Sequence, residues 1–320
     1  MRKLVFIYLL LLPLVAAFGQ GNLSVEEMTE KGLRLYEEKN YAEAVECFRD
    51  AAERGYAAAQ YKLGICYANG EGVERNYEKA VKWYRDAAEQ GDAFAQINLG
   101  ICYLNGRGVP KDVTEGLRWY HKAADQEHPV AFFNLGNVYN DGKYVKRDAK
   151  EAVKWWRKSA DLGYPLAQYN LAHAYLKGEA VRKDEKKAIE LFLKAANQGY
   201  PPAQNNMGSF YLAGINGVNQ DYAEAVRWYR AAADRGYPSA MYGLGVCYLN
   251  GTGVPENHSE AMDWFRKAAE RGHAGSQCNL GIAYYNGDGV EKNEAEARMW
   301  LQRAAEKGDA KAKNFLNQHF

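Results

Sequence analysis

Apolar residues in this chain recur with a long period. Within each period they stand three or four positions apart, a spacing that predicts amphipathic helices rather than strands. A leucine–glycine pair, or a close relative of it, marks each period, and its copies are 36 residues apart except across one extra residue near Ala213–Asn216. The copies are Leu63-Gly64, Leu99-Gly100, Leu135-Gly136, Leu171-Ala172, Met207-Gly208, Leu244-Gly245 and Leu280-Gly281. Seven copies in phase between residues 56 and 308 predict a repeat protein.

The first half of each repeat predicts one helix, for which Ala57–Asn69 is the example. Columns of the repeat are named after the residues of this first copy, so column 62 holds Lys62 and every residue in register with it. On a helix, columns 59, 63 and 66 fall on one face, which we expect to be buried. Gly64 leaves room for a neighbouring helix to approach, and Gly70 can adopt the left-handed conformation that ends a helix.

The second half of each repeat predicts another helix, preceded by a short polar side chain that can cap its free amides. The residues at this position are Asn40, Asn76, Asp112, Asp148, Asp184, Asp221, Asn257 and Asn293. Glutamate follows three residues later in most copies, which predicts the reciprocal capping box. These glutamates are Glu43, Glu115, Glu151, Glu224, Glu260 and Glu296. The helix also carries a bulky pair, such as Trp83-Tyr84, that we assign to the core rather than to a ligand.

A pair of short helices cannot bury its apolar faces alone, but stacked pairs can. We therefore expect an all-α solenoid of helical hairpins. Residues 56–308 hold the seven repeats. Residues 20–55 form a hairpin in front of them, in which Gly32 and Phe48 are spaced as in a tetratricopeptide repeat. Residues 309–320 predict a final helix, rich in lysine, that caps the stack.

The N-terminal segment differs from the rest of the chain. Arg2 and Lys3 precede an uncharged apolar run from Leu4 to Ala17, and the small residue Gly19 follows. This is the pattern of a secretory signal peptide, and the run is shorter than a membrane-spanning helix requires. We expect residues 1–19 to be removed on export, and the mature chain to be periplasmic or secreted, with no membrane span.

Two stretches carry a resemblance to a known family. Ala95–Val109 reads Ala-Gln-x-Asn-Leu-Gly-x-x-Tyr-x-x-Gly-x-Gly-Val, and Ala80–Gly91 reads Ala-x-x-Trp-Tyr-x-x-Ala-Ala-x-x-Gly. Over residues 56–308 the chain resembles the Sel1-like repeat proteins of the tetratricopeptide-like superfamily. The resemblance implies a right-handed α-α superhelix with a concave groove lined by the first helices. It also implies an adaptor that binds a protein or peptide partner.

Three columns of the first helix are expected to face that groove. Column 62 is asparagine in five repeats, and a ladder of amides can bind the main chain of an extended peptide. These residues are Asn98, Asn134, Asn170, Asn206 and Asn279. Column 65 is polar only in the central repeats, where it holds Asn137, His173 and Ser209. Column 61 supplies aromatic side chains of the kind that anchor binding partners, namely Tyr61, Phe133, Tyr169 and Tyr242.

Two interpretations of these residues remain open. The asparagines of column 62 either bind a ligand or bond to the neighbouring repeat's backbone and hold its register. Their place in the family consensus favours the second interpretation. For the polar centre of column 65 we favour partner binding, because it departs from an otherwise apolar column. The sequence does not decide the role of single tyrosines.

Composition and motifs exclude several functions. The 41 basic and 40 acidic residues leave a net charge of +1, which gives no long-range attraction for nucleic acid. The 6 histidines include no His-x-x-x-His pair and the chain has no Cys-x-x-Cys motif, so we expect neither a metal site nor a cofactor. Neither Ser-x-x-Lys nor Lys-Thr-Gly occurs, which argues against catalysis of the β-lactamase type.

We therefore predict a monomeric, non-catalytic interaction scaffold. The alternative, from another class of function, is an exported effector or a hydrolase of cell-wall or β-lactam material, as described for cysteine-rich relatives. Those relatives pair cysteines within a repeat, and that pairing is missing here. Of the 5 cysteines, only Cys47 and Cys66 could form a disulfide, because the other neighbours in column 66 stand too far apart.

Overall fold

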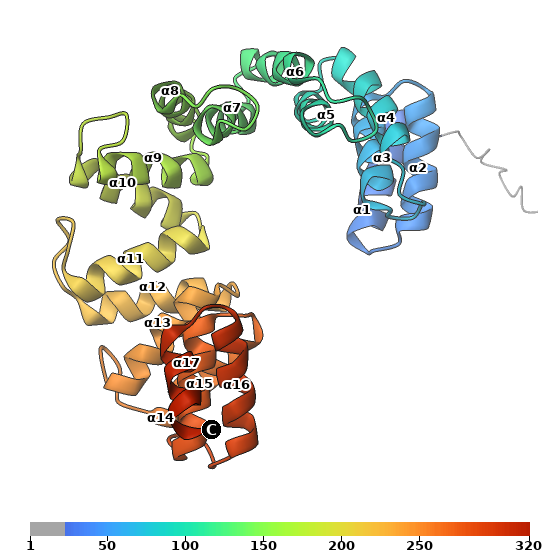
Figure 1. Cartoon of the computed structure of the whole chain (residues 1–320). Coiled ribbons are helices and arrows are strands. Elements are labelled where there is room, and N and C mark those ends of the chain that lie inside the picture. The colour runs from blue at the N-terminus through green and yellow to red at the C-terminus, as the bar shows by residue number, and fades with distance from the viewer. Residues whose placement is uncertain (1–22) are drawn as a thin grey trace, which may run out of the picture. The chain divides into compact units, whose positions relative to one another are not determined.

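The computed structural model describes residues 23–320, in which every regular element is an α-helix (Figure 1). The segment 1–19, expected to be a signal peptide, lies outside the described residues. Seventeen helices alternate between the two kinds that the sequence predicts, and residues 23–320 contain no strand. Among these helices, none has both the length and the apolar character needed to cross a membrane.

Helix bounds follow the repeat. The first helices of the hairpins, with the last helix of the chain, are α1 (Val25–Glu37), α3 (Ala57–Asn69), α5 (Ala93–Asn105), α7 (Pro129–Asp141), α9 (Pro165–Lys177), α11 (Pro201–Ala213), α13 (Pro238–Asn250), α15 (Ala274–Asn286) and α17 (Ala310–His319). The second helices are α2 (Tyr41–Glu53), α4 (Tyr77–Glu89), α6 (Val113–Asp125), α8 (Ala149–Asp161), α10 (Glu185–Asn197), α12 (Tyr222–Asp234), α14 (His258–Glu270) and α16 (Glu294–Glu306). The predicted bounds of α3 are confirmed.

The chain divides into two compact units, which are described separately. The first unit ends at Asp112 and contains α1 to α5, each packed against the next. The second unit begins at Val113 and contains α6 to α17, again with each helix packed against its neighbour in sequence. In both units helical hairpins stack on one another, so the predicted all-α solenoid is confirmed.

The two helices of a hairpin meet at the glycine of the leucine–glycine pair. A Cβ atom at Gly64 would lie 2.6 Å from the ring of Tyr84 in the next helix. Carbon atoms that are not bonded to each other rest about 3.5–4.0 Å apart, so a side chain at Gly64 would displace the ring. In the first hairpin Gly32 makes the same contact with Phe48, at 2.6 Å. The predicted role of Gly64 in close helix approach is therefore confirmed.

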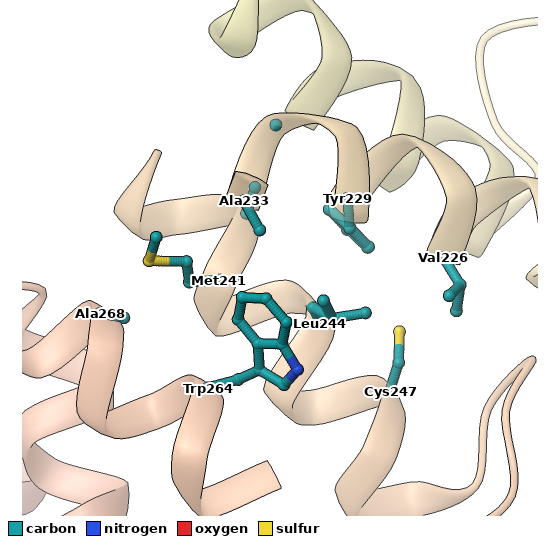
Figure 2. Close-up of a cluster of buried hydrophobic side chains, with 10 residues drawn as sticks. Val226, Tyr229, Ala233, Met241, Leu244, Cys247, Trp264 and Ala268 are labelled. Carbon is teal, nitrogen blue, oxygen red and sulfur yellow. The ribbon is translucent and has the colours of Figure 1, made fainter. Parts of the chain in front are cut away.

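The buried side chains form a series of local cores rather than one centre. Figure 2 shows the cluster in which Leu244 and Cys247 of α13 lie with Val226 of α12 and Trp264 of α14. Columns 63 and 66 are thus buried, as predicted. The predicted core position of the tryptophan column is confirmed for Trp119, Trp228, Trp264 and Trp300, each at most 7% exposed, whereas Trp83 and Trp155 are half-buried. Val254, in the loop after α13, packs against the same cluster.

The predicted caps of the second helices are confirmed in six cases. In each of them the side-chain oxygen accepts a hydrogen bond from a backbone N–H of the first turn. These caps are Asn76, Asp148, Asp184, Asp221, Asn257 and Asn293. Asn40 precedes α2 in the same way but makes no such bond.

The predicted capping box of the second helices is wrong, and the backbone explains why. In α8 a box would join the Asp148 N–H to the Glu151 carboxylate, but that N–H donates to the carbonyl of Tyr139 at 2.9 Å. Glu151 instead pairs with Lys154 at 3.1 Å. The tyrosine of column 67 takes the cap's N–H in every second helix from α4 to α16, which leaves the glutamate free for other partners.

Glycines in the loops bring the backbones of successive repeats into contact. A Cβ atom at Gly72 would lie 2.2 Å from the carbonyl oxygen of Tyr41, in the second helix of the preceding hairpin. At Gly108 a Cβ atom would lie 2.3 Å from the carbonyl oxygen of Tyr77. The other glycines with this contact are Gly253 and Gly289. In these repeats column 72 can therefore hold only glycine.

Two glycines of the first unit separate the effect of this contact from that of backbone conformation. Gly108 and Gly91 both have positive φ, but a Cβ atom at Gly91 would meet nothing within 4 Å. We expect Gly91→Ala to lower the free energy of unfolding by about 1 kcal/mol, because alanine is strained at positive φ. Gly108→Ala should cost about 1–3 kcal/mol more, because the new methyl group overlaps the backbone. Urea unfolding of both variants measures the difference, and equal losses would contradict the role of the contact.

Candidate functional site

The polar centre of column 65 packs against the second helix of its own hairpin. The Trp156 indole N–H donates to the Asn137 side-chain oxygen at 3.0 Å. The Ser209 and Tyr229 hydroxyls lie 3.0 Å apart in a hydrogen bond. His173 has its ring edge-to-face with a phenylalanine of α10, with centroids 4.9 Å apart. All three polar residues are half-buried, and each has an internal contact that accounts for its polar or aromatic group.

Asparagines of column 62 join neighbouring repeats through their side chains. The Asn170 amide of α9 donates to the Asn137 oxygen of α7 at 3.4 Å. One repeat further on, the Asn206 amide lies 3.4 Å from Nε2 of His173. In the first unit Asn98 of α5 lies near the hydroxyl of Tyr61 of α3. These contacts favour the register-holding interpretation for three asparagines, although the bonds go to side chains rather than to the neighbour's backbone. Whether a partner also contacts them stays a prediction.

The remaining two asparagines and the aromatic residues of column 61 are also half-buried. Asn134 lies on α7, and Asn279 lines a cavity beside α15. Each aromatic residue of column 61 in the second unit packs edge-on or tilted against the residue that precedes the next first helix. These pairs are Phe133–Tyr164 at 5.2 Å, Tyr169–Tyr200 at 5.3 Å and Tyr242–His273 at 4.8 Å between ring centroids. The aromatic column therefore also couples repeats.

Sequence reasoning missed the buried glutamine of column 60. Its side-chain amide donates to a carbonyl near the end of the preceding second helix, for example from Gln96 to Ala88 at 3.1 Å. In two repeats its oxygen accepts a second bond from the glutamine that ends the next second helix, as from Gln90 to Gln60 at 2.7 Å. The other members of the column with the carbonyl bond are Gln60, Gln168, Gln204 and Gln277. The signal was present, because glutamine recurs in an otherwise buried stretch.

A second missed contact links arginines to the tyrosines of column 67. In the second unit Arg230 donates to the hydroxyl of Tyr248 at 2.6 Å, from α12 to α13. Arg266 and Tyr284 repeat this bond at 3.1 Å. The tyrosine column thus binds the cap of its own hairpin through its carbonyl and the preceding hairpin through its hydroxyl. The sequence shows the tyrosines but not these two partners.

A cavity of about 170 Å³ lies between two hairpins of the second unit. Its walls come from α7 and α8 on one side and from α9 and the loop after it on the other. The lining residues are Asn140, Ala149, Val153, Trp156, Asn170, His173, Ala174, Lys177 and Glu179. Two of the residues singled out from the sequence, Asn170 and His173, therefore share one cavity. We call it the central cavity.

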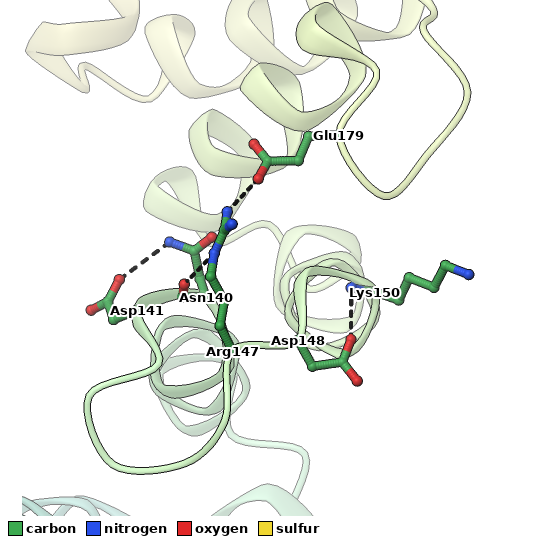
Figure 3. A network of polar contacts seen from close by, with 6 residues as sticks. All are labelled: Asn140, Asp141, Arg147, Asp148, Lys150 and Glu179. Carbon is green, nitrogen blue, oxygen red and sulfur yellow. Dashed lines mark hydrogen bonds and ion pairs between the residues drawn. The ribbon is translucent and has the colours of Figure 1, made fainter.

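A network of polar side chains lies at the mouth of the central cavity and joins its two walls (Figure 3). Arg147 pairs with Glu179 across the gap between the two hairpins. The Nε of Arg147 also donates to the carbonyl oxygen of Asn140 at 3.0 Å, and the Asn140 amide donates to Asp141 at 3.2 Å. Glu179 and Lys177 are exposed, whereas Trp156 is 7% exposed, so the cavity runs from a charged mouth to a buried floor.

The same place between two later hairpins holds a second cavity of about 200 Å³. Most of its lining comes from equivalent columns, with Leu249 in place of Asn140, Ile282 in place of His173 and Asn286 in place of Lys177. Lys311 of α17 lines it as well and has no equivalent in the central cavity. We call it the distal cavity. The two cavities show that a gap between hairpins belongs to the architecture, and that its chemistry is set by a few columns.

Cysteines of the described chain are all free, so Cys47 and Cys66 are not bonded. Burial raises the pKa of Cys66 to about 12 and that of Cys247 to about 11. Thiols with such pKa values remain protonated near neutral pH and are poor nucleophiles. Within residues 23–320 no cluster of histidine, cysteine or acidic residues is arranged to hold a metal ion.

Comparisons with known proteins agree with the geometry. The Sel1 repeat family model matches eight stretches, at residues 17–56, 57–92, 93–128, 129–164, 165–200, 201–237, 238–273 and 274–309. The matches include the hairpin that sequence analysis set apart as tetratricopeptide-like. No curated protein matches the chain.

Two solved structures are similar over most of their length. A Sel1 repeat protein from Oxalobacter formigenes is 36% identical, with a TM-score of 0.69 over 92% of this chain and 86% of that one. A protective antigen of uropathogenic Escherichia coli strains, c5321, which displays the same repeat fold, is 30% identical. Its TM-score is 0.55 over 90% of this chain and 78% of that one.

Two histidines of the second unit should titrate in opposite directions. Burial and the nearby Lys177 ammonium lower the pKa of His173 from its usual value near 6.5. The hydrogen bond to Asp288 raises the pKa of His258. As the pH falls below 6.5, His173 should therefore destabilise the folded chain, because the unfolded chain binds its proton more tightly. His258 should contribute its full stabilisation below 6.5 and lose it as the pH rises through its raised pKa.

Ring C–H resonances followed by NMR test this prediction. The His173 midpoint should lie below 6.5 and the His258 midpoint above it, and His173→Gln and His258→Gln assign the two signals. A His173 midpoint at or above 6.5 would show that its burial beside Lys177 is wrong.

Proposed function

Because the chain belongs to the Sel1 repeat family, whose solenoids are typical protein-interaction scaffolds, we propose that it binds an extended segment of a partner protein along its first helices. The observation that carries the proposal is a break in the repeat pattern. Asn137, His173 and Ser209 replace the apolar residues of column 65 on three successive first helices, α7, α9 and α11. Asn137 and Ser209 also bond within their own hairpins, to Trp156 and Tyr229, so the proposal rests on the clustering of the three polar residues in successive repeats.

The side chains around this polar centre suit an extended segment. Asn170 and Asn206 each use one amide N–H for an internal bond of 3.4 Å, and every amide carries a second N–H and an oxygen. Half-buried aromatic residues, Phe133 and Tyr169, stand in the adjacent column. Amides that can bond a main chain, beside rigid aromatic side chains, are the combination found at peptide-binding surfaces.

A non-catalytic role is supported by the state of the candidate nucleophiles. The pKa of Cys102 and that of Cys278 are each raised to about 11 by burial, as for the other buried thiols. His173 bonds Asn206 rather than a serine or cysteine that it could activate. These contacts support the scaffold over the hydrolase alternative.

The proposed role includes export, for which the support is the sequence of residues 1–19 alone. A positive start, an apolar run and small residues after it are the parts of a secretory signal peptide. In this proposal the solenoid acts in the periplasm or outside the cell.

Capture of the partner tests the scaffold. Tagged chain with Asn137→Ala and His173→Ala should recover at least about tenfold less of a stoichiometric protein partner from the native envelope fraction than the unchanged chain, because two central polar contacts are lost. Quantitative mass spectrometry of the captured proteins gives the ratio. The matched control is Val246→Ala with Ile282→Ala, two substitutions in the same column outside the polar centre, which should retain the partner.

If both pairs of substitutions lower the recovery of the partner equally, the partner binds outside the polar centre. If no partner is recovered and the purified chain hydrolyses nitrocefin, the scaffold proposal is wrong and the hydrolase alternative stands.

Export has its own test. Intact mass spectrometry of the chain from an envelope fraction should show an N-terminus near Gln20, because signal peptidase cleaves after small residues. Replacing Leu10 and Leu11 by aspartate should abolish cleavage and retain the chain inside the cell. Unprocessed chain confined to the cell interior would contradict export without affecting the scaffold.

A further inference from the structure

We propose that the central cavity is an anchor site for a single carboxylate carried by the bound partner, either an acidic side chain or a chain end. The inference rests on the proposed function for the partner itself, but the site can be tested without one. The distal cavity also has polar walls, an exposed cation and a buried floor, but it lies outside the polar centre and has Ile282 where the central cavity has His173.

The first argument comes from the repeat, which supplies its own internal comparison. Column 68 is alanine, leucine or tyrosine in six repeats and asparagine only at Asn140. Column 69 is neutral or acidic except at Lys177. Column 65 is a histidine only at His173. All three exceptions line the central cavity, although they come from two different helices. The three exceptions therefore all fall at one junction between hairpins.

The second argument is the way in which the central cavity is opened. In four repeats a loop glycine lies against the backbone at the start of the preceding second helix, as Gly72 does against Tyr41. At the central cavity the equivalent residues are Ala180 in the loop and Ala149 on α8. Ala180 keeps the positive φ of 61° but has a Cβ atom, which that contact cannot admit. Ala180 therefore excludes the usual loop contact, and the small Ala149 lines the cavity where those four repeats have tyrosine or histidine.

The third argument is charge. Two charged residues line the cavity, Lys177 and Glu179, and the Glu179 carboxylate is already paired with Arg147. Within residues 23–320 no salt bridge engages Lys177. The amides of Asn140 and Asn170 add donors on the same walls. An unpaired ammonium with amide donors beside it recognises an anion with several acceptor sites, and a carboxylate is the anion that proteins carry.

Size decides between a whole ligand and a single group. Pockets for cofactors and drug-sized molecules hold roughly 300–1,000 Å³. The central cavity holds about 170 Å³, well below that range. It therefore suits one carboxylate on a short stem, with the rest of the partner outside along the first helices.

The direct test uses small acids and no partner. Reductive methylation with ¹³C-formaldehyde labels the lysines of the full chain and keeps their charge, and Lys177→Met assigns the Lys177 signal. Titration with acetyl-glutamate amide should shift that signal in a saturable way, whereas acetyl-glutamine amide, the neutral analogue, should not. N-acetylglycine tests a chain-end carboxylate, and the tighter of the two acids identifies the source. If the Lys177 signal moves no more than those of exposed lysines with either acid, the proposal is wrong.

A second test joins the site to the proposed function. Peptides selected from a random library on the full chain should share one acidic residue or require a free chain end. Lys177→Met should weaken their binding about tenfold or more, as expected for loss of a charged hydrogen bond. Asn286→Met, the equivalent substitution in the distal cavity, should change it less than about twofold.

The outcomes separate the two ideas. Peptides that bind equally well to Lys177→Met leave the scaffold standing and overturn the carboxylate anchor. Failure to select any peptide counts against the proposed function, and the lysine titration then decides the anchor alone.

Discussion

The fold depends on how closely the two helices of each hairpin approach. At the leucine–glycine pair an aromatic ring of the second helix lies where a side chain would otherwise stand, 2.6 Å from a Cβ atom built on Gly64 and 2.7 Å from one built on Gly208. Because the ring fills this space, the two helices of a hairpin pack closely, and apolar residues remain on the faces that point toward the neighbouring hairpins. A hairpin with such apolar faces is stable only when it packs against another hairpin, so the hairpins must stack.

Stacking then requires that polar groups at each junction find partners, since a buried amide without one costs about 1–3 kcal/mol. The glutamine of column 60 meets this need by donating to the carbonyl of a preceding helix, as Gln60 does to Ala52 at 3.2 Å. The tyrosine of column 67 joins a cap in its own hairpin to an arginine in the one before. These contacts use few residues per repeat, which explains why the other columns are free to vary.

Sequence alone predicts the periodic part of this structure well. Helix bounds, caps and core columns follow from residue type and spacing, because each is decided within one hairpin. The capping box fails because the carbonyl of Tyr139, nine residues before the cap of α8, competes for its N–H. The bonds of Asn170 and Asn206 were also out of reach, since they depend on the offset between neighbouring first helices. A pattern of spacing shows which columns are special, but not how one hairpin is placed on the next.

The placement of one hairpin on the next also explains how the polar centre is tolerated. In a stack where each hairpin touches only its neighbours, a change of chemistry at one junction affects stability there and leaves distant junctions unaltered. Asn137 can therefore replace an apolar residue at small cost, since it gains bonds from Trp156 and from Asn170. Lys177 has no comparable internal partner among the described residues, and neither burial nor register requires a cation at its position. The central repeats thus contain two kinds of departure from the repeat pattern, one whose polar groups bond within the fold and one, Lys177, that has no internal partner among the described residues. Lys177, the second kind, is therefore the residue at which a group from a binding partner can make a contact.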